Sequence, residues 1–408
     1  MPEASPKPAF SLPGHVPPAL FWDCDVTSFA QQFDDPFVGI KALQAKGDFL
    51  YLRGVSRGQS GWMPTRFSLI QEVFMDAKNF SNVNSIGVGP LMGVDWRLNP
   101  LEYDPPEHMA YRQVLQPFFQ PSAINGYDAL IRGVARELIA KIRGKGRINF
   151  IEEFASLFPS YIFLDLFGLP REELPTFFKW EHAFTRSGDM SVRAWGARSI
   201  LGYLEKHVEL RRASPRDDLM TSIINGQVKG RPLNHGEIMG MVMVLYFGGL
   251  DTVLSSLGWY FRHLATDRAL QMRLRNNLDD IPGTVDELLR AFGVVGTHRH
   301  VVDDMEFHGI QLKKGEIVMV PGWLACRDER QYADPHRIDP DRKARHLTLA
   351  TGVHNCLGAH LAKREIKIVL EEWLSAFRDI RVSDGMPQKW NATGVWAMTE
   401  LWLDLDPV

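Results

Sequence analysis

The chain has 408 residues, of which 45% are hydrophobic, and a formal net charge of −3 at pH 7. Charges of both signs are interspersed, which excludes a strongly basic nucleic-acid-binding surface and a strong electrostatic attraction to membranes. The length exceeds the usual limit of a single core, so length alone favours two domains. Three scattered cysteines (Cys24, Cys326 and Cys356) are too few for a disulfide framework, which indicates a reducing compartment.

The N-terminal segment contains six prolines between Pro2 and Pro18 and lacks an apolar run of signal-peptide length. We therefore expect residues 1–20 to form an irregular arm. The longest apolar stretch runs from Met239 to Leu250 and is shorter than a bilayer-spanning helix requires. These features predict a cytoplasmic protein that does not enter a membrane.

The first half of the chain is expected to begin with short strands and continue as helices. Strand patterns occur over Phe49–Leu52 and Gly61–Thr65, and a helix is expected from Ser68. Residues 81–104 are rich in Gly, Asn and Pro, and we predict a long loop there, which in a compact chain usually has a function. Apolar residues then recur with helical periodicity, which predicts helices over 107–116, 123–143, 151–167, 172–186, 192–212, 217–224, 234–265 and 268–277.

Strand patterns return after residue 290. The segment from Met305 to Val320 is expected to form a hairpin that turns at Lys314–Gly315, and a further strand is expected over Val395–Leu405. The sequence therefore predicts a mainly α fold with small β-sheets near both ends (α+β).

A glycine-bounded cysteine is the most informative motif. Cys356 lies in the run Leu349-Ala-Thr-Gly-Val-His-Asn-Cys-Leu-Gly358, and a helical pattern follows directly. A helix N-terminus lowers the pKa of a nearby thiol, so we expect a thiolate there. Such a thiolate is a suitable axial ligand for a haem iron. The alternative for this residue alone is an inert cysteine buried in a turn.

A second motif lies in the expected helix over 234–265. Val244, Gly248, Asp251 and Thr252 share one helical face. The pair Gly248-Gly249 costs roughly 1 kcal/mol per glycine in a helix, which indicates that something approaches the backbone closely. The Thr252 hydroxyl is expected to bond back to the Gly248 carbonyl. The alternative is a buried, kinked helix with a satisfied polar residue.

The cysteine run resembles the haem-ligand loop of the cytochromes P-450, the haem-thiolate monooxygenases, with Leu349 and Ala350 where that family usually has Phe and Gly. The resemblance extends from about residue 20 to the end and is greatest to the bacterial camphor-hydroxylase branch, notably over 223–232, 248–252 and 307–315. It implies one large helical haem domain over 21–408 and haem b bound through Cys356. It also implies that Asp251 and Thr252 manage protons beside the dioxygen pocket.

The resemblance assigns further residues. Glu287 and Arg290, followed by Arg342 in the segment 334–342, are expected to form a buried ion network that supports the cysteine loop. Groups that would hold the haem or its propionates are His108, Arg112, Arg299, His354, Gly248, Gly352 and Gly358. Residues that would line the substrate pocket are Trp96, Val244, Phe247, Val295, Thr297 and Val395. The alternatives are ordinary surface cations for the first group and core residues for the second.

The function that the resemblance implies is hydroxylation of a small apolar substrate with O2, with a monoterpenoid or similar compact cyclic compound as the first choice. The camphor branch has a tyrosine hydroxyl where Trp96 stands, which argues against camphor itself. Electrons are expected from a [2Fe–2S] ferredoxin served by a NAD(P)H-dependent reductase. A basic docking surface would include Arg112, Lys343, Arg345, Lys363 and Arg364.

Other functional classes are less consistent with the sequence. A peroxide-driven peroxygenase on the same fold would usually lack the Asp251-Thr252 pair, and a non-catalytic haem sensor would lack proton relays. The sequence contains no Cys-x-x-Cys and no His-x-x-x-His for zinc, and Gly87, Gly89 and Gly93 are wrongly spaced for a dinucleotide fingerprint. We expect a monomer that binds neither nucleic acid nor membrane.

Overall fold

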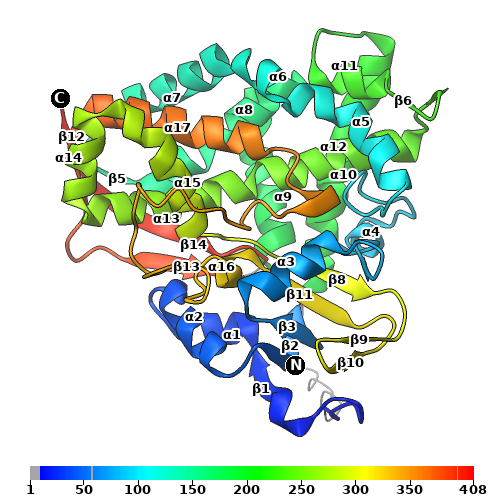
Figure 1. The fold of residues 1–408 in the computed structure, drawn as a ribbon. Helices are drawn as coiled ribbons and strands as arrows, with labels where there is room; N and C mark the ends of the chain where they lie inside the picture. The colour runs from blue at the N-terminus through cyan, green and yellow to red at the C-terminus, as the bar shows by residue number, and fades with distance from the viewer. Residues whose placement is uncertain (1–9, 57, 393) are drawn as a thin grey trace, which may run out of the picture.

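Helices form most of the molecule and pack above a smaller region of sheets (Figure 1). The computed structural model describes residues 10–56, 58–392 and 394–408. Its α-helices are α1 (Val26–Ala30), α2 (Pro36–Ala45), α3 (Phe67–Met75), α4 (Gly89–Met92), α5 (Glu107–Phe119), α6 (Pro121–Asn125), α7 (Asp128–Ile142), α8 (Leu157–Phe167), α9 (Leu174–Arg186), α10 (Met190–Ala213), α11 (Leu219–Ile224), α12 (His235–Gly249), α13 (Asp251–Thr266), α14 (Arg268–Asn276), α15 (Ile281–Ala291), α16 (Gly322–Ala325) and α17 (Ala359–Ala376). The predicted mainly α fold is confirmed.

The main sheet has six strands and lies below most of the helices in the view of Figure 1. Its order is β1 (Phe21–Asp25), β2 (Phe49–Ser56), β3 (Gln59–Pro64), β11 (Ile317–Pro321), β8 (Gly296–Val301) and β4 (Phe80–Ser81). The smaller sheets pair β9 (Met305–Phe307) with β10 (Ile310–Leu312), β6 (Gln227–Val228) with β7 (Arg231–Pro232), and β14 (Ala397–Pro407) with β5 (Arg147–Asn149), β12 (Phe377–Val382) and β13 (Gln388–Asn391).

The long helix expected over 234–265 is in fact two helices. α12 ends at Gly249 and α13 begins at Asp251, with Leu250 between them at φ −97° and ψ −66°. The glycine pair does not sustain the α-helical hydrogen bonds, so the interruption falls beside Thr252. The combined stretch, His235–Thr266, is long and apolar enough to cross a membrane, but 56% of its most apolar window is buried inside the protein, as expected of a core helix.

The hairpin predicted at Lys314–Gly315 is wrong. The turn lies instead at His308 (φ 51°) and Gly309 (φ 79°), so that β9 pairs with β10. Two positive φ values match the twist of a two-residue hairpin turn, and His tolerates this conformation better than most side chains. Gly315 (φ 83°) makes a second turn that leads into β11, and β11 pairs with β8 and β3.

Two other expected helices are interrupted. The one expected over 123–143 divides into α6 and α7 at Gly126–Tyr127, and the one expected over 151–167 begins with a π-helical segment, Ile151–Ala155, before α8. The predicted long loop over 81–104 is confirmed apart from the single turn of α4. The described part of the expected N-terminal arm is irregular up to a short 3-10 helix, Pro18–Leu20; residues 1–9 lie outside the described part.

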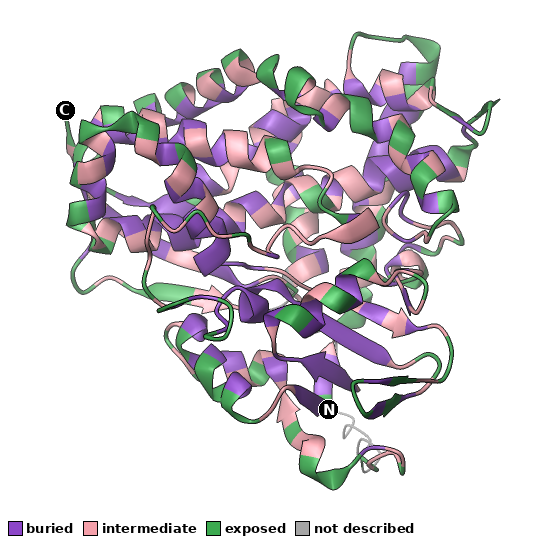
Figure 2. Cartoon of the chain, in the orientation of Figure 1, coloured by how far each residue is buried: buried purple, intermediate pink, exposed green. Residues whose placement is uncertain are grey.

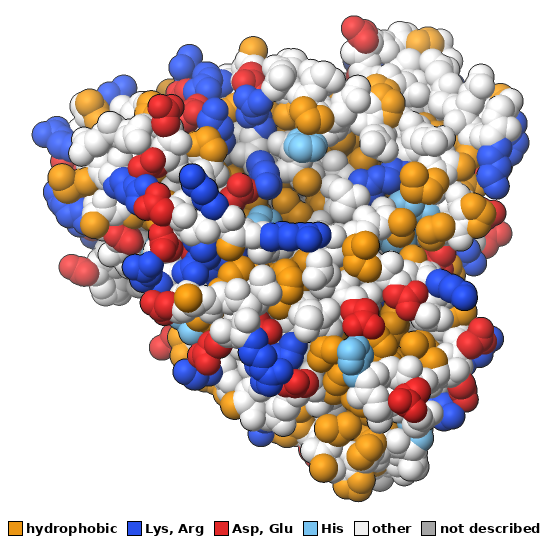
Figure 3. Space-filling model, in the orientation of Figure 1, with side chains coloured by type: hydrophobic (Ala, Val, Ile, Leu, Met, Phe, Trp, Pro, Cys, Tyr) orange, Lys and Arg blue, Asp and Glu red, His pale blue; other side chains and the backbone are white. Residues whose placement is uncertain are grey.

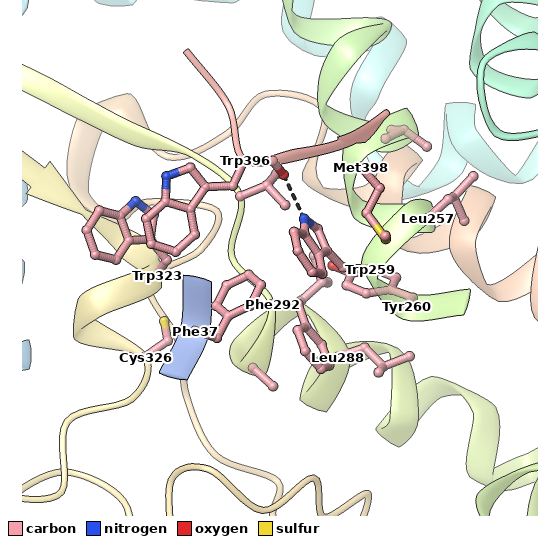
Figure 4. Close-up of a cluster of buried hydrophobic side chains, with 14 of the residues drawn as sticks. Phe37, Leu257, Trp259, Tyr260, Leu288, Phe292, Trp323, Cys326, Trp396 and Met398 are labelled. Carbon is pink, nitrogen blue, oxygen red and sulfur yellow. Dashed lines mark hydrogen bonds between the residues drawn. The ribbon is translucent and has the colours of Figure 1, made fainter. Parts of the chain in front are cut away.

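Aromatic side chains contribute much of the larger of two hydrophobic cores, and buried residues occur in both the helices and the main sheet (Figure 2). Phe37 packs edge-on against Trp259 and Trp396, and Trp323 stacks on Trp396 with ring centroids 4.2 Å apart (Figure 4). Trp259 Nε1 donates a hydrogen bond to the Trp396 carbonyl at 2.8 Å. These contacts fix the start of β14, and with it Val395, against α13 and α16.

Candidate active site

The cysteine loop lies between the segment 334–351 and α17. The Cys356 amide donates to the Leu349 carbonyl at 2.9 Å, which closes the loop. Gly352 has φ +74°, and a Cβ atom there would lie 2.7 Å from the Phe74 carbonyl oxygen, so the close approach to α3 requires glycine. Gly358 is the N-cap of α17, and its amide donates to the Cys356 sulfur. The predicted loop geometry is therefore confirmed.

The protonation of Cys356 differs from the prediction. Burial raises the pKa of the thiol, and the opposing effects of the Gly358 amide and of Arg112 do not overcome it. The expected lowering by the helix N-terminus is therefore wrong for the chain alone, because desolvation of the thiolate outweighs the nearby dipoles. Many protein atoms surround the Cys356 sulfur, but solvent still reaches this residue, unlike Cys326, so a metal cation bound there would stabilise the thiolate.

The interruption between α12 and α13 exposes one face of this core helix. Gly248 is exposed, and Val244, Phe247, Asp251 and Thr252 are half-buried, whereas Met241, Val242 and Met243 are fully buried. Apart from its chain neighbours and the backbone of its own helix, no described residue has an atom within 4 Å of a Cβ atom placed on Gly248. The Thr252 hydroxyl donates to the Gly248 carbonyl at 2.8 Å, as predicted. The glycine therefore leaves room beside the helix, which a flat ligand could use.

Two arginines near the cysteine loop, buried Arg299 and half-buried Arg112, lack a carboxylate partner. Arg299 is 3% exposed and donates to the His298 carbonyl at 2.9 Å, and burial lowers the pKa of its guanidinium to about 10. Arg112 Nη1 donates to the carbonyls of Val353 (3.3 Å) and Asn355 (2.8 Å), and burial lowers its pKa as well. Among the described residues, neither has an Asp or Glu oxygen within 4.0 Å. Buried cations normally have anionic partners, so both arginines favour an anionic ligand.

Two histidines complete this group, which we call the cationic cradle (His108, Arg112, Arg299 and His354). The rings of His108 and His354 are 4.3 Å apart, and burial lowers the pKa of His108 to about 4. His108 Nδ1 and Thr297 Oγ1 in β8 are buried and have no hydrogen-bond partner among the described residues, whereas His354 Nε2 forms a long contact with Asp104. Both arginines lie close enough to His354 to lower its pKa, although burial is the larger cause. These unmatched donors and charges fit the two propionates of an iron porphyrin.

The structure adds two residues to the cradle that the sequence analysis missed. Asn82 Nδ2 lies 3.4 Å from His354 Nδ1, and Asp104 Oδ1 lies 3.7 Å from His354 Nε2. Asp104 also accepts hydrogen bonds from the Ser81 hydroxyl and the Asn82 amide, so it orients the polar base of the 81–104 loop. The only local pattern in the sequence is Asp104 before two prolines, and this pattern predicts an ordinary turn.

The predicted ion network is confirmed. Arg290 is completely buried, and its guanidinium binds both carboxylate oxygens of Glu287 at 2.7 and 2.8 Å. Arg342 Nε donates to Glu287 at 3.1 Å, and its other nitrogens donate to the carbonyls of Ala333, Asp334 and Arg337. Arg290 Nη1 also donates to the Cys326 carbonyl at 2.7 Å. The network thus connects α15 and α16 to the segment that precedes the cysteine loop.

The residues predicted to line the pocket are only partly brought together. Val295 and Val395 face each other across an isolated antiparallel bridge, and Phe247 packs 5.4 Å from the ring of Phe184. Trp96 packs against Gly236, twelve residues before Gly248 and therefore about 18 Å along the helix axis. Its place in the pocket remains a prediction.

Three of the five residues of the predicted basic surface are bound to other groups of the protein. Lys363 pairs with Asp286 at 2.7 Å, Arg364 pairs with Asp128 at 2.9 Å, and Arg112 is engaged with loop carbonyls. Lys343 and Arg345 are exposed and have no carboxylate within 4.0 Å among the described residues. Figure 3 shows acidic side chains interspersed with basic ones over the face that carries α17.

Comparison with known proteins agrees with this geometry. The family model described as cytochrome P-450 matches residues 184–284 and 281–400. The probable cytochrome P-450 127A1 of Sinorhizobium fredii is 31% identical over 382 residues, which cover 92% of each chain. The crystal structures of CYP101J2 and CYP101C1 superpose with TM-scores of 0.86 and 0.88, at 31% and 30% identity, and each match covers 97% of this chain and 100% of the other.

The CYP101 neighbours also support the resemblance to the camphor-hydroxylase branch. The family binds haem b through a cysteine thiolate, which is the ligand that the loop and the cradle fit. The chain therefore belongs to the cytochrome P-450 family of haem monooxygenases.

Proposed function

We propose that Cys356 is the axial thiolate ligand of haem b and that the cationic cradle binds the propionates. The observation that carries this proposal is the cradle itself, since neither buried Arg299 nor half-buried Arg112 has a carboxylate within 4.0 Å among the described residues. When bound, the haem supplies the oxidising chemistry. Gly248 leaves the space that substrate and dioxygen need beside the helix, and Gly352 and Gly358 shape the loop around the sulfur.

The role proposed for Asp251 and Thr252 is to hold and deliver protons. The Thr252 hydroxyl hydrogen is directed to the Gly248 carbonyl, so its lone pairs remain available to accept a hydrogen bond from the pocket side. Asp251 is the first residue of α13 and is half-buried, so its carboxylate lies at the positive end of a helix. A hydroxyl and a carboxylate on successive residues form the minimal relay for moving a proton inward.

Replacing Thr252 by Ala tests this role. We expect near-normal haem content, with NAD(P)H consumption diverted from product to hydrogen peroxide, because the variant lacks the hydroxyl that holds the proton. The measurement is the ratio of product and peroxide formed to NAD(P)H consumed, with Thr266→Ala as the control, since Thr266 lies at the far end of α13. Coupling to product that stays at the wild-type level would contradict the role.

For the substrate we infer a compact, cyclic, apolar compound, with monoterpenoids as the first class to examine. Val244, Phe247, Val295 and Val395 offer apolar surface, and Thr297 offers one hydroxyl, so the pocket would recognise shape with few polar anchors. Trp96 supplies no hydroxyl, which argues against camphor. A screen of terpenoids against the ferric protein, read by the change in haem absorbance, tests this inference. The absence of any response across the panel would contradict it.

For the electron donor we infer a [2Fe–2S] ferredoxin reduced by a NAD(P)H-dependent reductase. Lys343 and Arg345 are the cations best placed to meet an acidic partner, whereas Lys363 and Arg364 are partly neutralised by Asp286 and Asp128. Turnover should fall as salt concentration rises. Faster product formation with peroxide alone than with the ferredoxin system would favour a peroxygenase instead.

We also infer that residues 21–408 act as one haem domain, and that the protein is a cytoplasmic monomer.

A further inference from the structure

Glu102 is a buried carboxylate within the 81–104 loop. It is 4% exposed, and its two oxygens accept hydrogen bonds from the backbone amides of Ile86 (2.8 Å), Gly87 (3.0 Å) and Leu98 (3.1 Å). The Glu102 amide donates in turn to the Leu98 carbonyl at 2.8 Å. A single side chain therefore ties together two points of the loop that are eleven residues apart, Gly87 and Leu98.

The charge of Glu102 has no cationic partner. Among the described residues, no Lys, Arg or His nitrogen lies within 4.0 Å of its carboxylate, so the three amides are its main compensation. Hydrogen bonds to a buried carboxylate are stronger than those to a neutral oxygen, and their loss leaves buried groups unsatisfied. The loop conformation therefore depends on these three hydrogen bonds to the Glu102 carboxylate.

The segment that Glu102 closes, residues 86–98, packs on α12, the helix that also carries Val244 and Phe247. Val88, Met92 and Leu98 are buried in the same hydrophobic cluster to which Val244 and Phe247 contribute. The loop also rests on α12 directly, because Gly240 has no side chain where the Arg97 carbonyl approaches, and Asn99 Nδ2 donates to the Glu237 carbonyl at 3.0 Å. A change in the loop would therefore alter the pocket wall.

The base of the loop is anchored separately. Asn82 Nδ2 donates to the Leu101 carbonyl at 2.7 Å, and the Ser81 hydroxyl and the Asn82 amide both donate to Asp104, beside His354. These bonds hold the ends of the loop to the cationic cradle without Glu102. Loss of the Glu102 carboxylate should therefore free the loop and leave the haem site in place.

We propose that Glu102 is a positioning residue whose carboxylate holds residues 86–98 over the pocket and thereby sets the affinity for bulky ligands. This inference rests on the proposed function, because it requires that the apolar space beside Val244 and Phe247 binds the substrate. Glu102→Gln keeps the shape of the side chain but replaces one acceptor oxygen by an NH2 group, which faces backbone N–H donors and cannot bond to them.

The test uses the haem-loaded protein and two iron-binding probes, imidazole and 4-phenylimidazole, titrated by absorbance. In Glu102→Gln we expect the Kd of 4-phenylimidazole to rise about tenfold, as loss of a charged hydrogen bond implies. The Kd of imidazole, which is too small to reach the loop, should change less than about twofold. Hydrogen exchange of the Ile86, Gly87 and Leu98 amides should accelerate. Glu107→Gln, an exposed glutamate on α5, is the matched control and should change none of these.

Each outcome has a distinct meaning. Unchanged exchange of the three amides, or equal loss of affinity for both probes, would overturn the positioning role. If Glu102→Gln does not accumulate as folded protein, Glu102→Asp replaces it in the test. This variant keeps the charge on a shorter side chain and should show the same selective loss of affinity for 4-phenylimidazole. A failure of the proposed function is recognised separately, from the absorption spectrum of the reduced wild-type protein with carbon monoxide. A spectrum typical of imidazole ligation would refute Cys356 as the iron ligand and would say nothing against the role of Glu102.

Discussion

Two pairs of arginines in this molecule, each with one buried and one half-buried member, differ in their carboxylate partners. Arg290 and Arg342 share the carboxylate of Glu287, and their remaining nitrogens bind backbone carbonyls. Arg299 is also buried and Arg112 is half-buried, yet both donate their hydrogen bonds to carbonyls, and the Arg299 guanidinium lies over the Phe74 ring. In the first group a carboxylate binds both arginines, whereas in the second no carboxylate lies within 4.0 Å of either arginine among the described residues, and Asp104 lies 3.7 Å from His354 instead.

This difference supports the proposal that the first group stabilises the fold and the second binds an anionic ligand. A buried ion pair that is complete in the chain contributes little net stability, but the loss of one partner is costly because the other charge remains. A buried cation without a partner destabilises the chain until an anion binds. The two groups should therefore respond in opposite ways when a charge is removed in the absence of haem.

The largest effect is expected for Glu287→Gln. The substitution leaves Arg290, which is 0% exposed, without its carboxylate, so the free energy of unfolding should fall by about 3–5 kcal/mol. The loss should be similar with and without haem, because the network does not depend on the ligand. Urea unfolding of both forms measures it. Glu329→Gln, which breaks an exposed pair with Lys41, should cost less than about 1 kcal/mol. A loss confined to the haem-loaded form would remove the distinction between the two groups.

Arg299→Gln should behave in the opposite way. Without haem, removal of a buried, unpaired charge should leave the free energy of unfolding unchanged or raise it by about 1 kcal/mol. With haem, the lost bonds to a propionate should weaken haem binding by about 1.5–3 kcal/mol, or roughly ten- to a hundredfold. Transfer of haem to a scavenging apoglobin measures the second effect, with the exposed Arg53→Gln as the control. Clear destabilisation of the haem-free protein would mean that Arg299 has a structural partner after all.

The sequence alone could reveal the complete network more readily than the incomplete one. Glu287 and Arg290 occupy one face of a single helix, so their pairing follows from a spacing of three residues, and helical periodicity located most of the surrounding helices. The cradle combines residues from α5, β8 and the cysteine loop, and the resemblance to a family, rather than any local pattern, brought them together.

The errors have a common physical origin in competition between local and distant interactions. Lys314-Gly315 is a good turn sequence and does form a turn, but the pairing of β11 with β8 and β3 decides which strands meet. The helix N-terminus at Cys356 does favour a thiolate, but desolvation of the sulfur outweighs it. Asn82 and Glu102 carried no local signal, and the pattern at Asp104 indicated only a turn, because the roles of all three depend on where the chain folds back.

The smallest predicted effect concerns the cysteine loop that lies between the two groups. Ala350 has φ +56°, a left-handed conformation that costs a residue with a Cβ atom about 1–2 kcal/mol. Ala350→Gly removes this strain, and the greater freedom of glycine in the unfolded chain offsets about 0.4–1 kcal/mol of the gain. The free energy of unfolding should therefore rise by roughly 0.5–1 kcal/mol in the haem-free protein, as measured by urea titration. Ala362→Gly, in the interior of α17, should instead lower it by about 1 kcal/mol. If both substitutions destabilise the protein equally, contacts of the Ala350 methyl group with the core offset the backbone strain. The loop would then depend on its packing in the same way as the complete network depends on Glu287.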